Sequence, residues 1–365
     1  MRVLVIGGTG FNGRRIVARL LDHDHSVTVV ARGDLPSGWQ ARVAQIRVDR
    51  KDAAAFGAAC AGLEFDAVID NIAYAPADAR GALEALEARI GQYLFTSTMA
   101  VYHDLLRRKS PVQEDEVRLD FRPGPDEGLE TALHPTRGHA YAIEKREVER
   151  VVQEARVPWT ALRASMIVGP DDWVGVIWWW IQRILDRGPI LIPETGHGHA
   201  FQVTYVEDLA DAFVAALGNR VAYRRAYNVA GPELLTAESL AGALAAPLGG
   251  GGECVRVPPS VIAAAGLDTY RVPLAGLPFG HVLLDTCRAQ HELSFTATPL
   301  DTWARATAEG CAASPPDSAS RHYDLRAREI ELTRLYAEAR ASADVAVRQR
   351  LLGVGSSMRS REAPC

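Results

Sequence analysis

Near its beginning the chain has a short apolar run, Val3 to Ile6, that leads directly into the glycine-rich segment Gly7 to Gly13 and then into a helical pattern. Glycines at such a turn let the backbone approach a pyrophosphate, and the helix that follows offers free N–H groups and a partial positive charge. A glycine triplet by itself also fits a plain tight turn. In this strand–turn–helix context it predicts a dinucleotide site formed by Gly7, Gly10, Phe11, Asn12 and Gly13.

Short apolar runs alternate with helix-length segments through the first half of the chain, which is typical of a parallel sheet covered by helices on both faces. The alternation stops after Gly169-Pro170. We therefore predict a doubly wound parallel α/β fold in three parts. These are a dinucleotide-binding domain over 1–168, a mainly substrate-binding region over 169–320 with some segments returning to the sheet, and a C-terminal helix and tail over 321–365.

Composition excludes several classes of function. Forty basic and 45 acidic side chains give a net charge of −5, so nucleic acid is not expected as the main partner. The five cysteines include no Cys-x-x-Cys pair and the histidines no ligand spacing, which predicts neither a disulfide framework nor a metal site. No apolar run reaches the roughly 18 residues of a membrane span. These features predict a soluble cytoplasmic protein.

The residues after the second expected strand bear on the choice of dinucleotide. An acidic side chain there would bind the adenosine 2′-hydroxyl of NAD, whereas an arginine pairs with the 2′-phosphate of NADP. The chain has Ala31, Arg32 and Gly33 at this point, with Arg14 nearby at the helix start. NADP is therefore favoured over NAD, although Asp34 would serve NAD after a rearrangement of the loop.

Tyr141 and Lys145 lie four residues apart in an expected helix, and so on one face of it. A neighbouring ammonium and an oxidised nicotinamide both favour the phenolate of a tyrosine whose ordinary pKa is about 10. Hydroxyl side chains, Ser97 and Thr98, occur where the strand expected at 93–97 ends. Ligands of parallel sheets bind beyond such strand ends, so either hydroxyl is expected to bond the reacting oxygen, strand-end capping being the alternative.

Three segments in this order, GGTGFNG, FTSTMAVY and YAIEK, resemble the extended short-chain dehydrogenase/reductase superfamily and its epimerase/dehydratase-like branch. The likeness covers most of residues 1–310 and implies a Rossmann-type sheet. It gives Tyr141 the acid/base role, Lys145 the supporting role and Thr98 the serine/threonine role. The other cofactor contacts that it implies are Asp49 and Arg50 at the adenine, and Asn71, Ala73, Ser165 and Met166 on the nicotinamide side.

Departures from the family pattern narrow the expected activity. Met99 and Ala100 follow Thr98 where the sugar-nucleotide dehydratases carry acidic residues, which disfavours dehydration. Phe201 stands where sugar-nucleotide epimerases place an arginine that clamps the diphosphate. The segment IDNIAYAP, together with Arg32-Gly33, resembles a subgroup that includes chloroplast RNA-associated relatives. The weaker candidates for substrate contacts are Tyr74, Ser97, Trp173, Trp178 and Phe201, each with core packing or a solvated position as the alternative.

The residues together predict an NAD(P)-dependent oxidoreductase that acts on a secondary alcohol or ketone of a sugar-, nucleoside- or nucleotide-sugar-like metabolite. Epimerisation uses the same residues twice, so the motifs leave net redox chemistry and epimerisation both open. A non-catalytic dinucleotide-sensing or RNA-associated protein is the alternative from another class. The expected partner is a small polyol, sugar or nucleoside, with no membrane, and a homodimer is expected by analogy with relatives.

Overall fold

The computed structural model describes residues 1–102, 110–120, 138–172, 175–194, 200–267, 281–315 and 323–359. Side chains at 138–139, 281–282 and 345–359 lie outside this description. Of the residues that the sequence singled out, Trp173 falls outside it.

The core of the protein is a seven-stranded parallel sheet in the order β11-β6-β5-β4-β1-β2-β3. Every pairing within it is parallel, and β1 lies between β4 and β2 in register from Val3 to Ile6. The prediction of a doubly wound α/β fold is confirmed. Its strands are β1 (Arg2–Ile6), β2 (Ser26–Val30), β3 (Val43–Ile46), β4 (Ala67–Asp70), β5 (Tyr93–Thr98), β6 (Trp159–Ala164) and β11 (Arg225–Val229).

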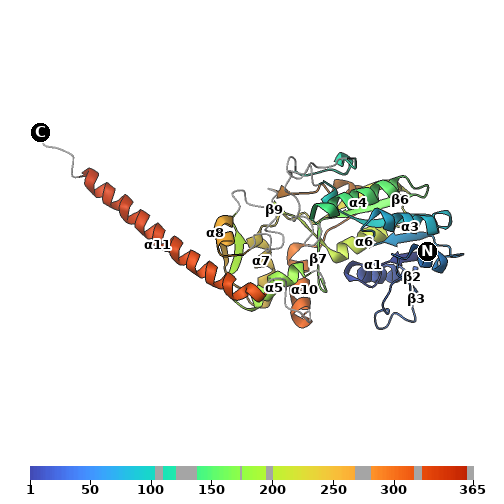
Figure 1. The fold of residues 1–365 in the computed structure, drawn as a ribbon, viewed down its shortest axis with the longest axis horizontal. Coiled ribbons are helices and arrows are strands. Elements are labelled where there is room, and N and C mark those ends of the chain that lie inside the picture. The colour runs from blue at the N-terminus through green and yellow to red at the C-terminus, as the bar shows by residue number, and fades with distance from the viewer. Residues whose placement is uncertain are drawn as a thin grey trace.

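Helices cover both faces of this sheet (Figure 1). One face is covered by α1 (Phe11–Asp22), α6 (Val206–Ala216) and α9 (Cys287–Leu293), whose apolar residues share one buried cluster with the strands. The other is covered by α2 (Ala53–Ala59), α3 (Pro76–Leu86) and α4 (Gly138–Gln153). Because β11, α6 and α9 come from beyond residue 169, part of the second half of the chain returns to the sheet.

The second half also builds a separate hydrophobic cluster around helix α5 (Val176–Leu185). Three consecutive tryptophans cannot share one face of a helix, yet Trp178, Trp179 and Trp180 are all buried here, at 7%, 1% and 0% exposure. A helix that is apolar all round is buried on every side, and this explains the run. The other strands and α-helices between β6 and α11 are β7 (Met166–Val168), β8 (Ile190–Pro193), β9 (Ala200–Phe201), β10 (Val203–Tyr205), α7 (Ala237–Ala245), β12 (Cys254–Val257), α8 (Pro259–Ala264), β13 (His281–Val282) and α10 (Leu300–Ala313).

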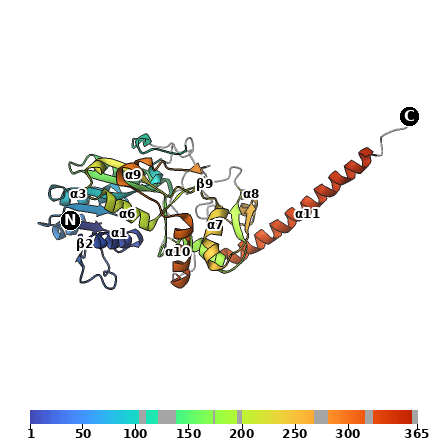
Figure 2. The same ribbon diagram turned by 180° about the vertical axis from the view of Figure 1, so that it is seen from behind.

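A 34-residue helix near the C-terminus, α11 (Arg326–Arg359), extends away from the body of the protein in both views (Figures 1 and 2). Its first turns are fixed by buried charges. Arg183 of α5 pairs with Glu329 at 2.7 Å while stacking on the ring of Trp179 at 3.7 Å, and Arg326 pairs with Asp186 at 2.7 Å. No helix within the described ranges is both long and apolar enough to cross a membrane.

The Arg183–Glu329 pair provides a test of how α11 is held. Glu329→Ala removes the carboxylate that pairs with the buried Arg183. We expect the free energy of unfolding to fall by about 3–5 kcal/mol and α11 to become sensitive to limited proteolysis. Glu338→Ala is the control, because it breaks the exposed Arg334–Glu338 pair on the same helix and should cost at most about 0.5 kcal/mol. Equal stability losses in thermal or urea unfolding would contradict this account.

Candidate functional site

A cavity of about 640 Å³ lies at the carboxyl ends of the central strands. Most of the residues that the sequence analysis named for cofactor and substrate line it. They are Gly7, Gly10, Phe11, Asn12, Arg32, Asp49, Arg50, Asn71, Tyr74, Ser97, Thr98, Tyr141, Lys145, Ser165 and Met166. The cavity wall does not include Gly13, Ala73, Trp178 or Phe201.

The glycine turn brings β1 and α1 into direct backbone contact. Gly7 has φ +85°, and a Cβ on Gly13 would lie 2.1 Å from the carbonyl oxygen of Gly7. Gly10 provides no side-chain cap for α1, and the side-chain oxygen of Asn12 is buried without a hydrogen-bond partner. The free N–H groups of such a helix N-terminus, open to a cavity, fit the pyrophosphate of a dinucleotide.

The cavity wall also carries charged side chains from the segments that follow β2 and β3. The Arg32 side chain is 80% exposed and forms an ion pair with Asp49 at 3.7 Å, and both residues line the cavity. Arg50, in contrast, is buried and donates to both carboxylate oxygens of Asp70, at 2.6 and 2.7 Å. Tyr93 donates to the same carboxylate at 2.7 Å. Arg50 therefore forms part of the cavity floor, held by an ion pair that the sequence analysis missed.

The catalytic candidates meet between α4 and the end of β5. Lys145 is 3% exposed, and its ammonium donates to the carbonyl oxygens of Ala73 at 2.8 Å and Thr96 at 2.7 Å. Burial lowers the pKa of Lys145 to about 8, against the opposing effect of Asp70 and other buried carboxylates. The ammonium form thus prevails at neutral pH and is lost as the pH rises through that value. Ala73 contributes through its carbonyl and does not line the cavity.

The two hydroxyls at the end of β5 have different partners. Ser97 donates to Glu149 at 2.5 Å, so its hydrogen is directed into the protein. The oxygen of Thr98 accepts the N–H of Ala100 at 3.2 Å, which leaves the hydroxyl hydrogen of Thr98 available at the cavity. Of the two candidates that the sequence left open, the geometry favours Thr98 as the donor to a reacting oxygen.

The end of the cavity beyond Tyr141 is mainly apolar, with Met99, Ala100, Met166, Ile167 and Val176 in its wall. Asp172 adds one buried carboxylate there, whose oxygen accepts the N–H groups of Val176 and Ile177 at 2.9 and 3.2 Å. The sequence analysis missed Asp172, because an aspartate that accepts the N–H groups of a helix start looks, in the sequence, like any aspartate of a loop.

Two of the weak substrate candidates lie elsewhere. Trp178 and Phe201, 7% and 2% exposed, belong to the cluster around α5 and have no place in the cavity wall. Tyr74 does line the cavity and is 37% exposed. Among the residues that the structure describes, no group of three or more His, Cys, Asp or Glu side chains is arranged to hold a metal ion.

Residues 3–230 match the model of the NAD dependent epimerase/dehydratase family. The chain belongs to this family. The resemblance to the extended short-chain dehydrogenases/reductases is thereby confirmed, and so is the expectation of an enzyme of that class. The match runs from β1 to the residue after β11, and therefore includes the whole central sheet and the cavity at its edge.

Two curated proteins are similar to part of this chain. A chloroplast stem-loop binding protein of 41 kDa from Arabidopsis thaliana is 28% identical over 257 residues, which are 67% of this chain and 62% of the relative. A 2-alkyl-3-oxoalkanoate reductase from Stenotrophomonas maltophilia is 30% identical over 191 residues, 47% of this chain and 52% of the relative. The chain thus spans about half to three fifths of these two proteins.

Solved structures of epimerases share the fold. A UDP-glucose 4-epimerase from Thermotoga maritima, with UDP-glucose, superposes with a TM-score of 0.65 at 19% identity, over 87% of this chain and 100% of that one. A UDP-glucuronic acid 4-epimerase from Bacillus cereus, in complex with NAD, gives 0.61 at 19% identity, over 87% and 99%. At this identity the comparison supports the architecture of the family and not a particular substrate.

The approach of Gly13 to Gly7 predicts the effect of one methyl group. We expect Gly13→Ala to force β1 and α1 apart, to cost about 1–3 kcal/mol of stability and to abolish dinucleotide binding. Titration of reduced-nicotinamide fluorescence, together with thermal unfolding, measures both effects. Gly57→Ala is the control, since a Cβ on Gly57 in α2 meets nothing within 4 Å and should leave binding unchanged. Normal binding by Gly13→Ala would refute this assignment of the pyrophosphate site.

Proposed function

We propose that the protein is an NAD(P)-dependent oxidoreductase that transfers hydride to or from a secondary alcohol or ketone of a sugar-, nucleoside- or nucleotide-sugar-like metabolite. The main support is that Tyr141, Lys145 and Thr98 meet the glycine turn in one cavity. A bound dinucleotide supplies or accepts the hydride in this chemistry. We further propose that residues 1–168 carry cofactor and catalytic groups, and that the region 169–320 completes the substrate end.

The side chains divide the proton chemistry between them. Thr98 donates a hydrogen bond to the substrate oxygen and holds the reacting carbon in place. Tyr141 gives that oxygen its proton in reduction and takes it in oxidation. Lys145, fixed by two carbonyl oxygens one helical turn from Tyr141, keeps a positive charge nearby that favours the phenolate.

Epimerisation is the alternative within the same chemistry, because Tyr141 serves oxidation and reduction alike. Membership of the family and the fold of the two epimerases support it. In a substrate screen, net redox would change reduced-nicotinamide absorbance in step with product, whereas an epimerase would invert a stereocentre with no net change. Met99 and Ala100 beside Thr98 give no acidic group for a dehydration.

A binding protein for RNA is the alternative from another class, favoured by the likeness to the chloroplast stem-loop binding protein. The net charge of −5 and the Tyr141–Lys145 pair argue against it, since binding RNA needs positive charge and no acid/base pair.

The four cysteines that the structure describes are free thiols, which supports a reducing, cytoplasmic location. A homodimer stays a prediction by analogy.

Replacement of the phenol tests the proposed function directly. Tyr141→Phe should lower the rate of hydride transfer by about 10²–10⁴-fold, because it removes only the proton donor and acceptor, while the affinity for the dinucleotide stays within about twofold. Single-turnover absorbance at the reduced-nicotinamide band and fluorescence titration measure the two quantities. Full activity in this variant would refute the catalytic role and would favour the binding-protein alternative.

We also propose that NADP is preferred over NAD, with Arg32 binding the 2′-phosphate. Arg32→Ala should weaken NADPH binding about tenfold to a hundredfold, the effect of one charged hydrogen bond, and leave NADH binding nearly unchanged. Fluorescence titrations with both dinucleotides measure the ratio. Arg47→Ala serves as the control, because it removes another exposed arginine, which directly follows β3 and pairs with Asp34. An equal loss for both dinucleotides would contradict the preference.

A further inference from the structure

One face of helix α4 packs against the C-terminal end of strand β5. Tyr141, Lys145 and Glu149 follow each other at intervals of four and so share this face. Tyr141 lies with Thr98 in the cavity wall. Lys145 donates to the carbonyl oxygen of Thr96, and Glu149 accepts the hydroxyl of Ser97. Glu149 thus lies one helical turn beyond Lys145 on the same face of α4, and it does not line the cavity.

Glu149 is the centre of a buried ion pair. It is 1% exposed and accepts two hydrogen bonds from Arg163, at 2.9 and 2.6 Å, besides the one from Ser97. Burial opposes its ionisation, but these donors hold the pKa of Glu149 below the ordinary value. Because Ser97 and Arg163 face each other across β5 and β6, the single carboxylate fastens α4 to two adjacent strands.

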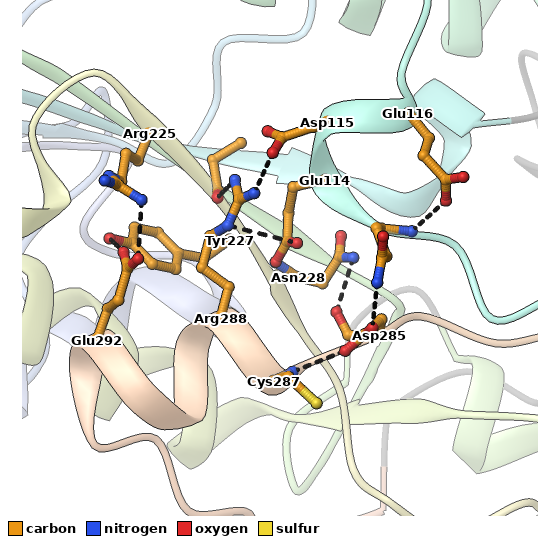
Figure 3. Close-up of polar contacts among 12 residues, drawn as sticks. Glu114, Asp115, Glu116, Arg225, Tyr227, Asn228, Asp285, Cys287, Arg288 and Glu292 are labelled. Atoms are coloured by element: carbon orange, nitrogen blue, oxygen red, sulfur yellow. Dashed lines mark hydrogen bonds and ion pairs between the residues drawn. The ribbon is translucent and has the colours of Figure 1, made fainter.

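The ion pair is in turn held by a network that reaches the outer edge of the sheet. Arg163 also donates to the hydroxyl of Tyr102 at 2.7 Å and to the carbonyl oxygen of Glu114 at 2.8 Å. Tyr102 donates to the side chain of Asn228 in β11, and the backbone N–H of Asn228 donates to the Glu114 carboxylate. Figure 3 shows this outer part, where Arg288 of α9 lies between Glu114 and Asp115.

We propose that Glu149 is a positioning residue for the reaction: through Ser97 and Arg163 it sets where α4 lies against β5, and so fixes Tyr141 and Lys145 relative to Thr98. The proposal rests on the proposed function. A fully buried ion pair is expensive to keep in an interior and would be replaceable by apolar side chains if packing were its only purpose. Here it joins the three elements whose relative position decides whether two hydroxyls reach one substrate oxygen.

The ionisation of Tyr141 reports this position without a known substrate. Its phenolate is favoured by Lys145, and Coulomb energies depend on the separation of the two groups. The charges that act on Lys145 come from Asp70 at the end of β4, Glu149, Asp78 of α3 and Arg50. The Ser97 variants leave all four unchanged, and the double variant removes only Glu149 among them, together with its partner Arg163. The proposed measurement is a pH titration of phenolate absorbance in the ultraviolet, with NADP⁺ bound. The same titration of a matching protein that carries Tyr141→Phe is subtracted, so that the difference reports Tyr141 alone.

The variants separate position from general stability. Ser97→Ala removes the hydroxyl that Glu149 accepts, Ser97→Thr keeps a hydroxyl, and Glu149→Gln combined with Arg163→Met removes both charges of the pair together. Thr160→Val is the matched control. Thr160 is equally buried on the neighbouring strand β6 and also donates from its hydroxyl, to Ala222 at 2.7 Å, but it is outside the cavity wall.

We expect Ser97→Ala and the double variant to raise the midpoint of Tyr141 ionisation by about one pH unit, a tenfold change in the ionisation constant. Ser97→Thr should restore it, and Thr160→Val should leave both the midpoint and the NADPH affinity unchanged. An unchanged midpoint in Ser97→Ala, with a lowered midpoint in the wild type, would overturn the positioning role alone. A wild-type midpoint near that of free tyrosine would overturn the proposed function and this proposal with it. Should the double variant fail to fold, the Ser97 series decides.

Discussion

The contact between the backbones of Gly7 and Gly13 is the constraint on which the cavity depends. Only without a Cβ at residue 13 does α1 start so close to the end of β1, and only then does its first turn face the space above the strand ends. The sheet order places β4 directly beside β1, and β5 beside β4. The segment after β4 and the end of β5 therefore meet the glycine turn at one edge, and α4, packed on β5, brings its functional face to the same place.

Much of this arrangement could be read from the sequence, because it rests on local patterns. The apolar runs that end at Ile6, Val30 and Ser97 correspond to strands of the sheet, since a strand buried on both faces needs almost only apolar residues. The glycine spacing and the four-residue interval between Tyr141 and Lys145 are equally local. Once the fold was given, the parallel strand ends brought these separate signals together, as the general rule for α/β sheets expects.

The parts that could not be predicted depend on contacts between distant segments. Arg50 and Asp70 are 20 residues apart, and no local pattern says that the arginine turns inward to meet that carboxylate. The position of the three tryptophans could not be predicted for the same reason. Whether an apolar helix faces a ligand or a hydrophobic core depends on the segments that surround it. A signal was present for Arg163, a charge within an otherwise apolar strand, which calls for a buried partner such as Glu149.

The long terminal helix has a consequence for the behaviour of the whole molecule in solution. At 1.5 Å per residue, 34 residues make a rod of roughly 50 Å, whose described contacts with the rest of the protein come from its N-terminal part. Hydrodynamic drag depends on the greatest extension more than on mass, so the particle should sediment more slowly, and scatter over longer distances, than a sphere of 39.6 kDa.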